Sequence, residues 1–352
     1  MKKYLVLGIM SGTSLDGLDL ALCQFTKNTF GENERWSFKL IFSQTYEYSK
    51  DLVKKLRQAQ YSDGLTLIVL HKYYGEFIAQ KVNEFLLNKP RPLLIASHGH
   101  TVFHYPQKRV NFQIGDGAVI ASLTNLPVVC DFRSQDIALD GQGAPFVPLG
   151  DYYLFEDYEL LLNLGGFSNL TIRRQLKAFD ICPVNFALNY FARLAGKEYD
   201  KDGLLGREGI VNMQLLEQLQ NLDYYSKPQP KSLSDHWFYN VFLPVVQSYD
   251  IGIEDKIRTI YEHISLQLAK SLAKYQGKVL ITGGGVFNKF LIELLKEKVQ
   301  NEIVIPSDEI INFKEAIIFG FLGLLRWLGK TNVFASVTGA KRDTSSGAIY
   351  LP

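Results

Sequence analysis

The stretch LVLGIMSGTSLDGLDLALCQF, residues 5–25, decides the fold because it joins two apolar runs through a polar loop. The runs at 5–7 and 18–22 predict two strands. Glycines permit tight and left-handed backbone in the connection, and hydroxyls add donors beside its amides: Gly8, Gly12, Gly17, Ser11, Thr13 and Ser14. The pattern predicts a hairpin whose loop can bind an anion.

Two carboxylates, Asp16 and Asp19, lie beside this donor-rich turn. Because amides hold phosphate oxygens and carboxylates hold hydrated magnesium, the combination is typical of a site for a metal-bound polyphosphate. A glycine-rich hairpin with surface aspartates is an equally good interpretation of this stretch alone.

Composition favours a soluble protein with two domains. The chain has 352 residues, of which 47% are hydrophobic, enough for two cores. With 38 basic and 36 acidic residues, overall charge favours neither nucleic acid nor an anionic membrane as a partner. The cysteines, Cys23, Cys130 and Cys182, are odd in number and lack CxxC spacing, which indicates a reducing compartment and hence the cytoplasm.

Neither a signal peptide nor a membrane helix is expected. The apolar run near the N-terminus is short and ends at Gly8. The longest uncharged apolar run, at 316–325, is far shorter than the roughly 20 residues that span a bilayer.

A second glycine-centred hairpin is predicted at 160–173, where Gly165-Gly166 separate two apolar runs. LLNLGGFSN repeats the plan of LVLGIMSGTS, with an apolar strand, a glycine turn and a hydroxyl. The repetition suggests a duplicated fold that grips one phosphate chain from both sides, although coincidence remains an alternative.

Three consecutive glycines, Gly283 to Gly285, separate a strand at 279–282 from a helix that begins near Asn288. Bare backbone at a helix N-terminus can hold a phosphate or a flat ring. The sequence Gly329-Lys330-Thr331 resembles the end of a P-loop, but it lies at the end of a helix, where a P-loop must lead from strand into helix.

Charged residues follow two of the predicted strands. Asp131 and Arg133 come after the strand at 127–130, and ligands of open α/β sheets bind at such carboxyl ends. The long polar connection that follows contains Asp136, Asp140, Gln142 and Gly143, and its length favours a functional role. Asp180 closes a short strand before a predicted helix, where a helix N-cap is the alternative role.

Three histidines, His98, His100 and His104, fall within seven residues. Metal ligation is conceivable, but no matching ligand cluster follows. Substrate contacts or a role in loop structure are therefore preferred.

A set of motifs now runs from near the first residue to the last: GIMSGTSLDGLDLAL, SHGHTVFHYP, QIGDGAVIA, VVCDFRSQDIALDGQGAPFVP, LNLGGFSNLT, YDKDG, TGGGVFN, KEAIIFGFLGLLRWL, VTGA and GAIYLP. With these motifs, in this order, the sequence resembles the anhydro-N-acetylmuramic acid kinases. That family belongs to the superfamily of actin, sugar kinases and heat-shock chaperone ATPases.

The resemblance implies an α/β fold with two actin-like (ribonuclease H-like) domains, mixed sheets flanked by helices and an ATP cleft between them. We expect the first domain at 1–130, completed by 335–352, and the second at 131–334. The implied reaction uses ATP and Mg²⁺: water opens the 1,6-anhydro bond while O6 takes the γ-phosphate, which gives N-acetylmuramic acid 6-phosphate in cell-wall sugar recycling. A cytoplasmic homodimer is implied as well.

The resemblance also implies residue roles. Asp180 is the expected base that takes a proton from the attacking water. Sugar contacts are expected from Arg133, Glu315, His98 and Gln142. Phosphate or nucleotide contacts are expected from Ser11, Gly12, Thr13, Asp16, Gly165, Gly166, Gly283, Gly284, Gly285 and Asn288. Asp16 and Asp19 are the expected magnesium ligands, either directly or through water.

Three motifs depart from the family. The usual DTGPGN is DICPVN here, with Cys182 and Val184 in place of glycines that could leave room at the site. KSTGRE becomes KSLSDH at 231–236, and HGQT becomes HGHT with His100. A nucleotide-binding relative with altered sugar range or lost turnover is therefore the alternative to a kinase. A metal-dependent hydrolase that uses His98, His100 and Asp136 is a third hypothesis.

Overall fold

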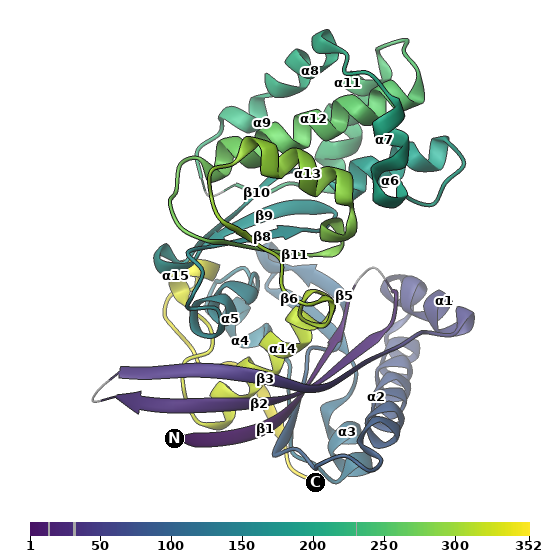
Figure 1. Cartoon of the computed structure of the whole chain (residues 1–352). Helices are drawn as coiled ribbons and strands as arrows, with labels where there is room; N and C mark the ends of the chain where they lie inside the picture. Colours follow the sequence, from purple (N-terminus) through teal and green to yellow (C-terminus); the bar gives the residue numbers. More distant parts are fainter. Residues whose placement is uncertain (13–14, 31–32, 230) are drawn as a thin grey trace. The chain divides into compact units, whose positions relative to one another are not determined.

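The computed structural model describes residues 1–12, 15–30, 33–229 and 231–352 of the chain (Figure 1). It contains two compact units. Unit 1 comprises Met1–Phe155 and Phe313–Pro352, and unit 2 comprises Glu156–Asn312.

Unit 1 is built on a mixed sheet of strand order β13-β7-β4-β1-β2-β3. Its strands are β1 (Lys2–Ser11), β2 (Leu18–Phe30), β3 (Asn33–Tyr46), β4 (Leu94–Ser97), β7 (Val128–Cys130) and β13 (Ala348–Tyr350). The first three strands are antiparallel, β4 and β7 run parallel to β1, and β13 is antiparallel to β7. A separate antiparallel ribbon consists of β5 (His100–Tyr105) and β6 (Val110–Ile114).

Unit 2 contains a sheet of order β10-β9-β8-β11-β12. Its strands are β8 (Leu160–Leu164), β9 (Phe167–Ile172), β10 (Lys177–Pro183), β11 (Val279–Thr282) and β12 (Ile303–Val304). The order and directions repeat those of β3-β2-β1-β4-β7, with three antiparallel strands followed by two parallel ones. The predicted α/β class and the predicted pair of glycine hairpins are confirmed, and the fold is duplicated.

Helices flank the sheet of unit 1. They are α1 (Lys50–Gln58), α2 (Gly64–Leu86), α3 (Gly117–Thr124), α4 (Ser134–Ala138), α5 (Val147–Leu154), α15 (Ala335–Thr338) and the part of α14 (Asp308–Trp327) from residue 313 on. Side chains on β1 alternate between the two faces of the sheet. Leu7 and Ile9 are buried in one core cluster with residues of α2 and α3, whereas Gly8 faces α14.

Gly8 allows α14 to lie directly against the sheet. A Cβ at Gly8 would come within 1.9 Å of the carbonyl oxygen of Ala316. Gly323 of the same helix similarly lies against Ala96 of β4. Gly8 is thus a packing residue within a strand, and the prediction that it belongs to the anion-binding turn is wrong.

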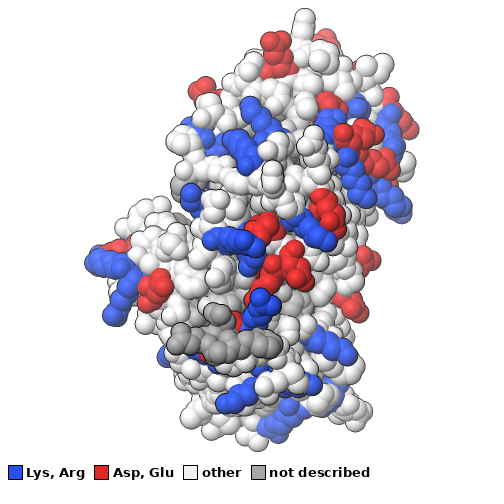
Figure 2. All heavy atoms as spheres, turned by 60° about the vertical axis from the view of Figure 1, so that its left-hand side comes forward, with Lys and Arg blue, Asp and Glu red and all other residues white. Residues whose placement is uncertain are grey.

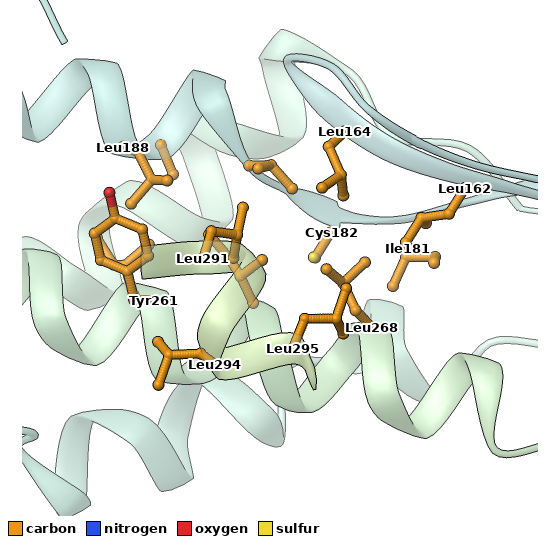
Figure 3. Close-up of a cluster of buried hydrophobic side chains, with 14 of the residues drawn as sticks. Leu162, Leu164, Ile181, Cys182, Leu188, Tyr261, Leu268, Leu291, Leu294 and Leu295 are labelled. Atoms are coloured by element: carbon orange, nitrogen blue, oxygen red, sulfur yellow. The ribbon is translucent and has the colours of Figure 1, made fainter. Parts of the chain in front are cut away.

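The helices of unit 2 enclose its own core. They are α6 (Asn185–Leu194), α7 (Leu204–Glu208), α8 (Met213–Gln220), α9 (Asp223–Ser226), α10 (Asp235–Trp237), α11 (Leu243–Gln247), α12 (Ile253–Leu272) and α13 (Lys289–Lys298). Leu162 and Leu164 of the sheet pack with Leu268 of α12 and Leu295 of α13, and all four are fully buried (Figure 3). This core holds the carboxyl ends of β8, β10 and β11 in place.

The limits of the units differ from the domain boundaries predicted at 130/131 and 334/335. Helix α5 contacts β3, and α4 contacts β6, so residues 131–155 pack with unit 1. From residue 313 on, α14 packs on β1 and β4, which brings 313–334 into unit 1 as well.

Surface charge is mixed. Lys and Arg side chains lie among Asp and Glu over much of the face in Figure 2, in agreement with the formal net charge of +2. Among the described residues, no helix is both long and apolar enough to cross a membrane.

Candidate functional site

Ser11 lies at the carboxyl end of β1, and its hydroxyl takes part in a chain of side-chain hydrogen bonds. Tyr48 donates to Ser11 Oγ at 2.8 Å, and His100 Nδ1 lies 3.2 Å from the same oxygen. The Tyr48 hydroxyl is also 2.7 Å from that of Tyr74. Ser11 is therefore fixed at the start of the loop. Thr13, which was predicted to lie beside it, falls outside the described residues.

Carboxylates gather on the same unit. Asp19 accepts a hydrogen bond of 2.6 Å from Thr45, and burial together with the charge of Asp16 raises its pKa. Glu315 is exposed as a residue, but desolvation of its carboxylate by the surrounding protein raises its pKa, which the charges of Lys314 and Arg133 oppose. The charge of Asp19 adds to the rise. These like charges favour a nearby cation, so Asp16 and Asp19 fit a hydrated Mg²⁺.

Arg133 is oriented by its neighbours in unit 1. Its Nη2 lies 2.8 Å from His98 Nε2, and its Nη1 donates to the carbonyl of Gly143 at 2.6 Å. His98 Nδ1 is 2.8 Å from the carbonyl of Gly99, so Nδ1 carries the proton and Nε2 accepts from Arg133. Burial, aided by the charge of Arg133, lowers the pKa of His98 to about 3. His98 is a neutral, buried acceptor that positions Arg133.

Asp136, in α4, anchors the polar connection that follows this helix through hydrogen bonds. This buried carboxylate accepts from the amide of Gly143 at 2.7 Å and from the hydroxyl of Thr338 at 2.6 Å. Gln142, the neighbour of Gly143, is exposed. Gly143 in turn accepts from Arg133, so Asp136 fixes the loop that holds the guanidinium.

The hypothesis of a hydrolase metal site is wrong. His98, His100 and Asp136 each hydrogen-bond a different partner, namely Arg133, Ser11 and Thr338. Over the described ranges, no group of three or more His, Cys, Asp or Glu side chains is arranged to hold a metal ion.

Asp180 lies inside β10 of unit 2. Its Oδ2 accepts from the amide of Leu233 at 2.8 Å, and its own amide donates to the carbonyl of Lys231 at 2.9 Å. Burial raises the pKa of Asp180 against the opposing effect of the Leu233 bond. The strand continues to Pro183 and the residue at the N-cap of α6 is Val184, so Asp180 neither ends the strand nor caps the helix.

Two glycine turns of unit 2 meet at one edge of its sheet. Gly165-Gly166 connect β8 to β9, and the glycines at 283–285 follow β11, the parallel neighbour of β8. Their neighbours confirm the contact, because a Cβ at Gly283 would lie 2.4 Å from Asn163 Oδ1. The predicted glycine residues are thus brought together.

The glycines at this edge differ in what they allow. A Cβ at Gly285 would lie 2.8 Å from that of Leu164, so Gly285 packs the turns together. A Cβ added at Gly166 or Gly284 would lie at least 3.8 Å from the nearest described atom outside its two chain neighbours, and both residues are exposed. Their backbone is open to a ligand.

Asn288 caps α13. Its Oδ1 accepts from the amide of Leu291 at 3.1 Å, and its Nδ2 donates to the hydroxyl of Tyr261 at 2.6 Å. The side chain is therefore engaged within unit 2 and fixes the start of the helix that follows the glycine triplet.

Comparison with known proteins agrees with these motifs. The model of the family described as anhydro-N-acetylmuramic acid kinase matches residues 4–352. The chain belongs to this family. It is 32% identical over 370 residues to the anhydro-N-acetylmuramic acid kinase of Sulfurimonas denitrificans, with 98% of each chain covered. It is 34% identical over 382 residues to the protein of that name from Francisella tularensis subsp. novicida, with 99% of this chain and 98% of that one covered.

Among solved structures, the chain is similar to the activator of the 2-hydroxyisocaproyl-CoA dehydratase from Clostridium difficile with bound ADPNP. The TM-score is 0.44 at 10% identity, with 90% of this chain and 94% of that chain covered.

The unusual residues of this family member in the DICPVN motif are buried in unit 2. Cys182 and Val184 are fully buried in the core of unit 2. Figure 3 shows Cys182 among Leu164, Ile181 and Leu268. In this family member the two side chains occupy core volume of unit 2.

Three of the contacts above have no clear signal in the sequence. The amide of Leu233 reaches Asp180 from a distant segment, and a backbone donor leaves no residue signature. Tyr48 stands in an unremarkable connection, yet it holds Ser11. The pairing of His98 with Arg133 depends on the parallel alignment of β4 and β7.

Proposed function

We propose that this family member is an ATP-dependent kinase of 1,6-anhydro-N-acetylmuramic acid. Water opens the 1,6-anhydro bond, O6 takes the γ-phosphate, and the products are N-acetylmuramic acid 6-phosphate and ADP, in the recycling of cell-wall sugar. The observation that carries the proposal is the family match over residues 4–352, which includes an aspartate in an environment suited to a base.

Asp180 is the proposed base. Attack of water on the anomeric carbon requires a group that takes a proton at that moment. Burial raises the pKa of Asp180, and the amide of Leu233 fixes its Oδ2 atom. The proton goes to Asp180, the C1–O6 bond breaks, and O6 forms its bond to the γ-phosphorus as ADP leaves.

Backbone and hydroxyl donors are the proposed phosphate ligands. In unit 1 these are Ser11, Gly12 and Thr13, with Asp16 beside them. In unit 2, the open backbone of Gly166 and Gly284 supports the same role for their turns, which include Gly165, Gly283 and Gly285. Asn288 acts by fixing the helix after the triplet.

Arg133, Glu315 and Gln142 are the proposed sugar ligands. A guanidinium suits the lactyl carboxylate of the sugar, because its fork of donors matches two oxygens. The hydrogen bonds from Arg133 to His98 and Gly143 support a preset orientation. His98, which was expected to touch the sugar, is given a positioning role instead.

Magnesium, when bound at Asp16 and Asp19, would neutralise charge on the phosphates. The raised pKa of Asp19 beside Asp16 supports this placement. A cytoplasmic location and a homodimer complete the proposal, on the basis of the family resemblance.

The test is incubation of the purified protein with 1,6-anhydro-N-acetylmuramic acid, ATP and Mg²⁺, with mass spectrometry of the sugar. We expect one phosphorylated and hydrated sugar for each ADP formed. Absence of phosphorylated sugar at high enzyme concentration contradicts the proposal. Thermal stabilisation by ATP without protection by the anhydrosugar would then identify the alternative, a nucleotide-binding relative that has lost turnover.

A further inference from the structure

A pocket of about 280 Å³ lies within unit 2, apart from the residues assigned above. Its walls come from β10, α9, the end of α12 and the connection that follows α9. The described lining residues are Phe179, Ile181, Tyr225, Ser226, Lys227, Pro228, Gln229, Lys231, Gln267, Lys270, Ser271 and Lys274.

Four of these lining residues are lysines, and none of those described is Asp or Glu. This differs from much of the surface in Figure 2, where the two signs are mixed. Lys270 and Lys274 lie near the C-terminus of α12, where cations are favoured by the helix dipole. That effect does not account for Lys227 and Lys231, which come from the connection after α9.

Lys231 is held in this positive environment by uncharged partners. Its Nζ donates to the carbonyl of Tyr224 at 2.9 Å and lies 4.5 Å from the centre of that ring. Burial lowers the pKa of Lys231, and the charges of Lys274, Lys270 and Lys227 lower it further. The lysines therefore repel one another, and an anion among them would relieve this repulsion.

We propose that this pocket binds a small phosphate-bearing anion, either inorganic phosphate or a compact phosphate ester. Its volume is just below that of pockets for drug-sized ligands, which measure about 300–1,000 Å³, so it suits a smaller molecule. Lysines bind phosphate as point charges, and Ser226, Gln229 and Ser271 add polar side chains to the wall.

The pocket shares its wall with the segment that holds Asp180. The carbonyl of Lys231 accepts from the amide of Asp180, and the amide of Leu233, two residues on, donates to its carboxylate. Tyr224, the partner of Lys231, donates to the carbonyl of Asp180 at 2.7 Å. An anion bound to Lys231 therefore acts on the segment that positions Asp180. Binding of an anion in this pocket does not depend on the proposed kinase activity. An effect of that anion on sugar turnover rests on the proposed function.

The test is isothermal titration of the full chain with inorganic phosphate, at ionic strength held constant with chloride. A non-hydrolysable ATP analogue at saturation occupies the nucleotide phosphate site. The double variant Lys270→Gln/Lys274→Gln changes two exposed residues and is compared with Lys296→Gln, an exposed lysine of α13 outside the pocket. We expect saturable binding that the double variant weakens by about tenfold or more, with no change in Lys296→Gln.

A parallel titration with N-acetylmuramic acid 6-phosphate distinguishes the two sources of phosphate, because the ligand of the pocket is the one whose binding the double variant weakens. Binding that is not saturable for either compound overturns the proposal. So does binding that the double variant leaves unchanged. Because these readouts involve no turnover, a protein without kinase activity can still pass them.

Discussion

The two glycine hairpins occupy equivalent places in two sheets of the same order, yet they carry different chemistry. The sequence of the β1–β2 connection contains hydroxyl and carboxylate residues, and a hydrogen bond from Tyr48 fixes Ser11 at its start. The β8–β9 turn exposes bare backbone at Gly166, and the neighbouring strand carries Asp180. The duplicated fold thus supplies two equivalent edges, one with a buried hydrogen-bond chain behind Ser11 and the other with exposed backbone at Gly166.

The glycines show the same contrast. Gly8 is needed because α14 lies against β1, whereas the space around Gly166 is open. Gly8 allows a helix to pack against the strand, whereas the backbone of Gly166 is exposed, although both glycines occur in similar sequence patterns.

The largest expected effect comes from replacing Asp180, the carboxylate that lies in β10 next to the second hairpin. Asp180→Asn keeps the shape and can still accept from Leu233, but it cannot take a proton. We expect kcat to fall by about 10³-fold, within the range for loss of a general base, with nucleotide affinity nearly unchanged. Steady-state kinetics and nucleotide titration measure the two effects.

Asp223→Asn, an exposed change in α9, is the matched control and should leave kcat unchanged. In the native protein, kcat/KM should fall as pH decreases through the raised pKa of Asp180, because the protonated carboxyl cannot act as a base. Full activity of Asp180→Asn would remove Asp180 from this role.

A pair of alanine substitutions separates the two kinds of glycine. Gly8→Ala places a methyl 1.9 Å from a carbonyl of α14, so the helix must shift, and we expect a loss of about 3 kcal/mol in the free energy of unfolding of unit 1. Gly166→Ala should change stability by less than about 0.5 kcal/mol. Urea denaturation followed by fluorescence checks both values, and equal losses would abolish the distinction.

Arg133→Lys probes the orienting network of unit 1. Lysine keeps the charge but cannot donate to His98 and Gly143 while presenting a fork to the sugar. We expect KM for the sugar to rise by about tenfold with kcat changed less than threefold. An unchanged KM would show that Arg133 does not contact the sugar.

His100→Gln should have the smallest effect. Glutamine, the usual residue in the HGQT motif, can replace the hydrogen bond to Ser11, so activity should stay within about twofold of the native value. His100→Leu removes that bond and should reduce activity further. Equal activities of the two variants would show that the bond is unimportant.

Local chemistry made much of the fold predictable. Glycine turns between apolar runs correctly indicated both hairpins, because turn geometry depends on adjacent residues. The role of Gly8 was not predictable in this way, since the helix that excludes a side chain there lies some 300 residues later in the sequence.

The sequence identified many residues of the candidate site, but it did not predict which neighbours orient them. Asp180 and Arg133 were singled out by their positions after apolar strands, and the roles that the resemblance implies for them are predictions. The partners that orient them, the amide of Leu233 and the ring of His98, are 53 and 35 residues away in the sequence. Such pairs form through tertiary packing, which periodicity and spacing do not encode.

The most direct test of the account is the fate of the water oxygen. The reaction is run with 1,6-anhydro-N-acetylmuramic acid, ATP and Mg²⁺ in H₂¹⁸O and quenched within the first turnovers. Mass spectrometry then locates the label. We expect ¹⁸O at the anomeric hydroxyl of the 6-phosphorylated sugar and none in its phosphoryl group. Label in free phosphate, with the anhydrosugar intact, would contradict it.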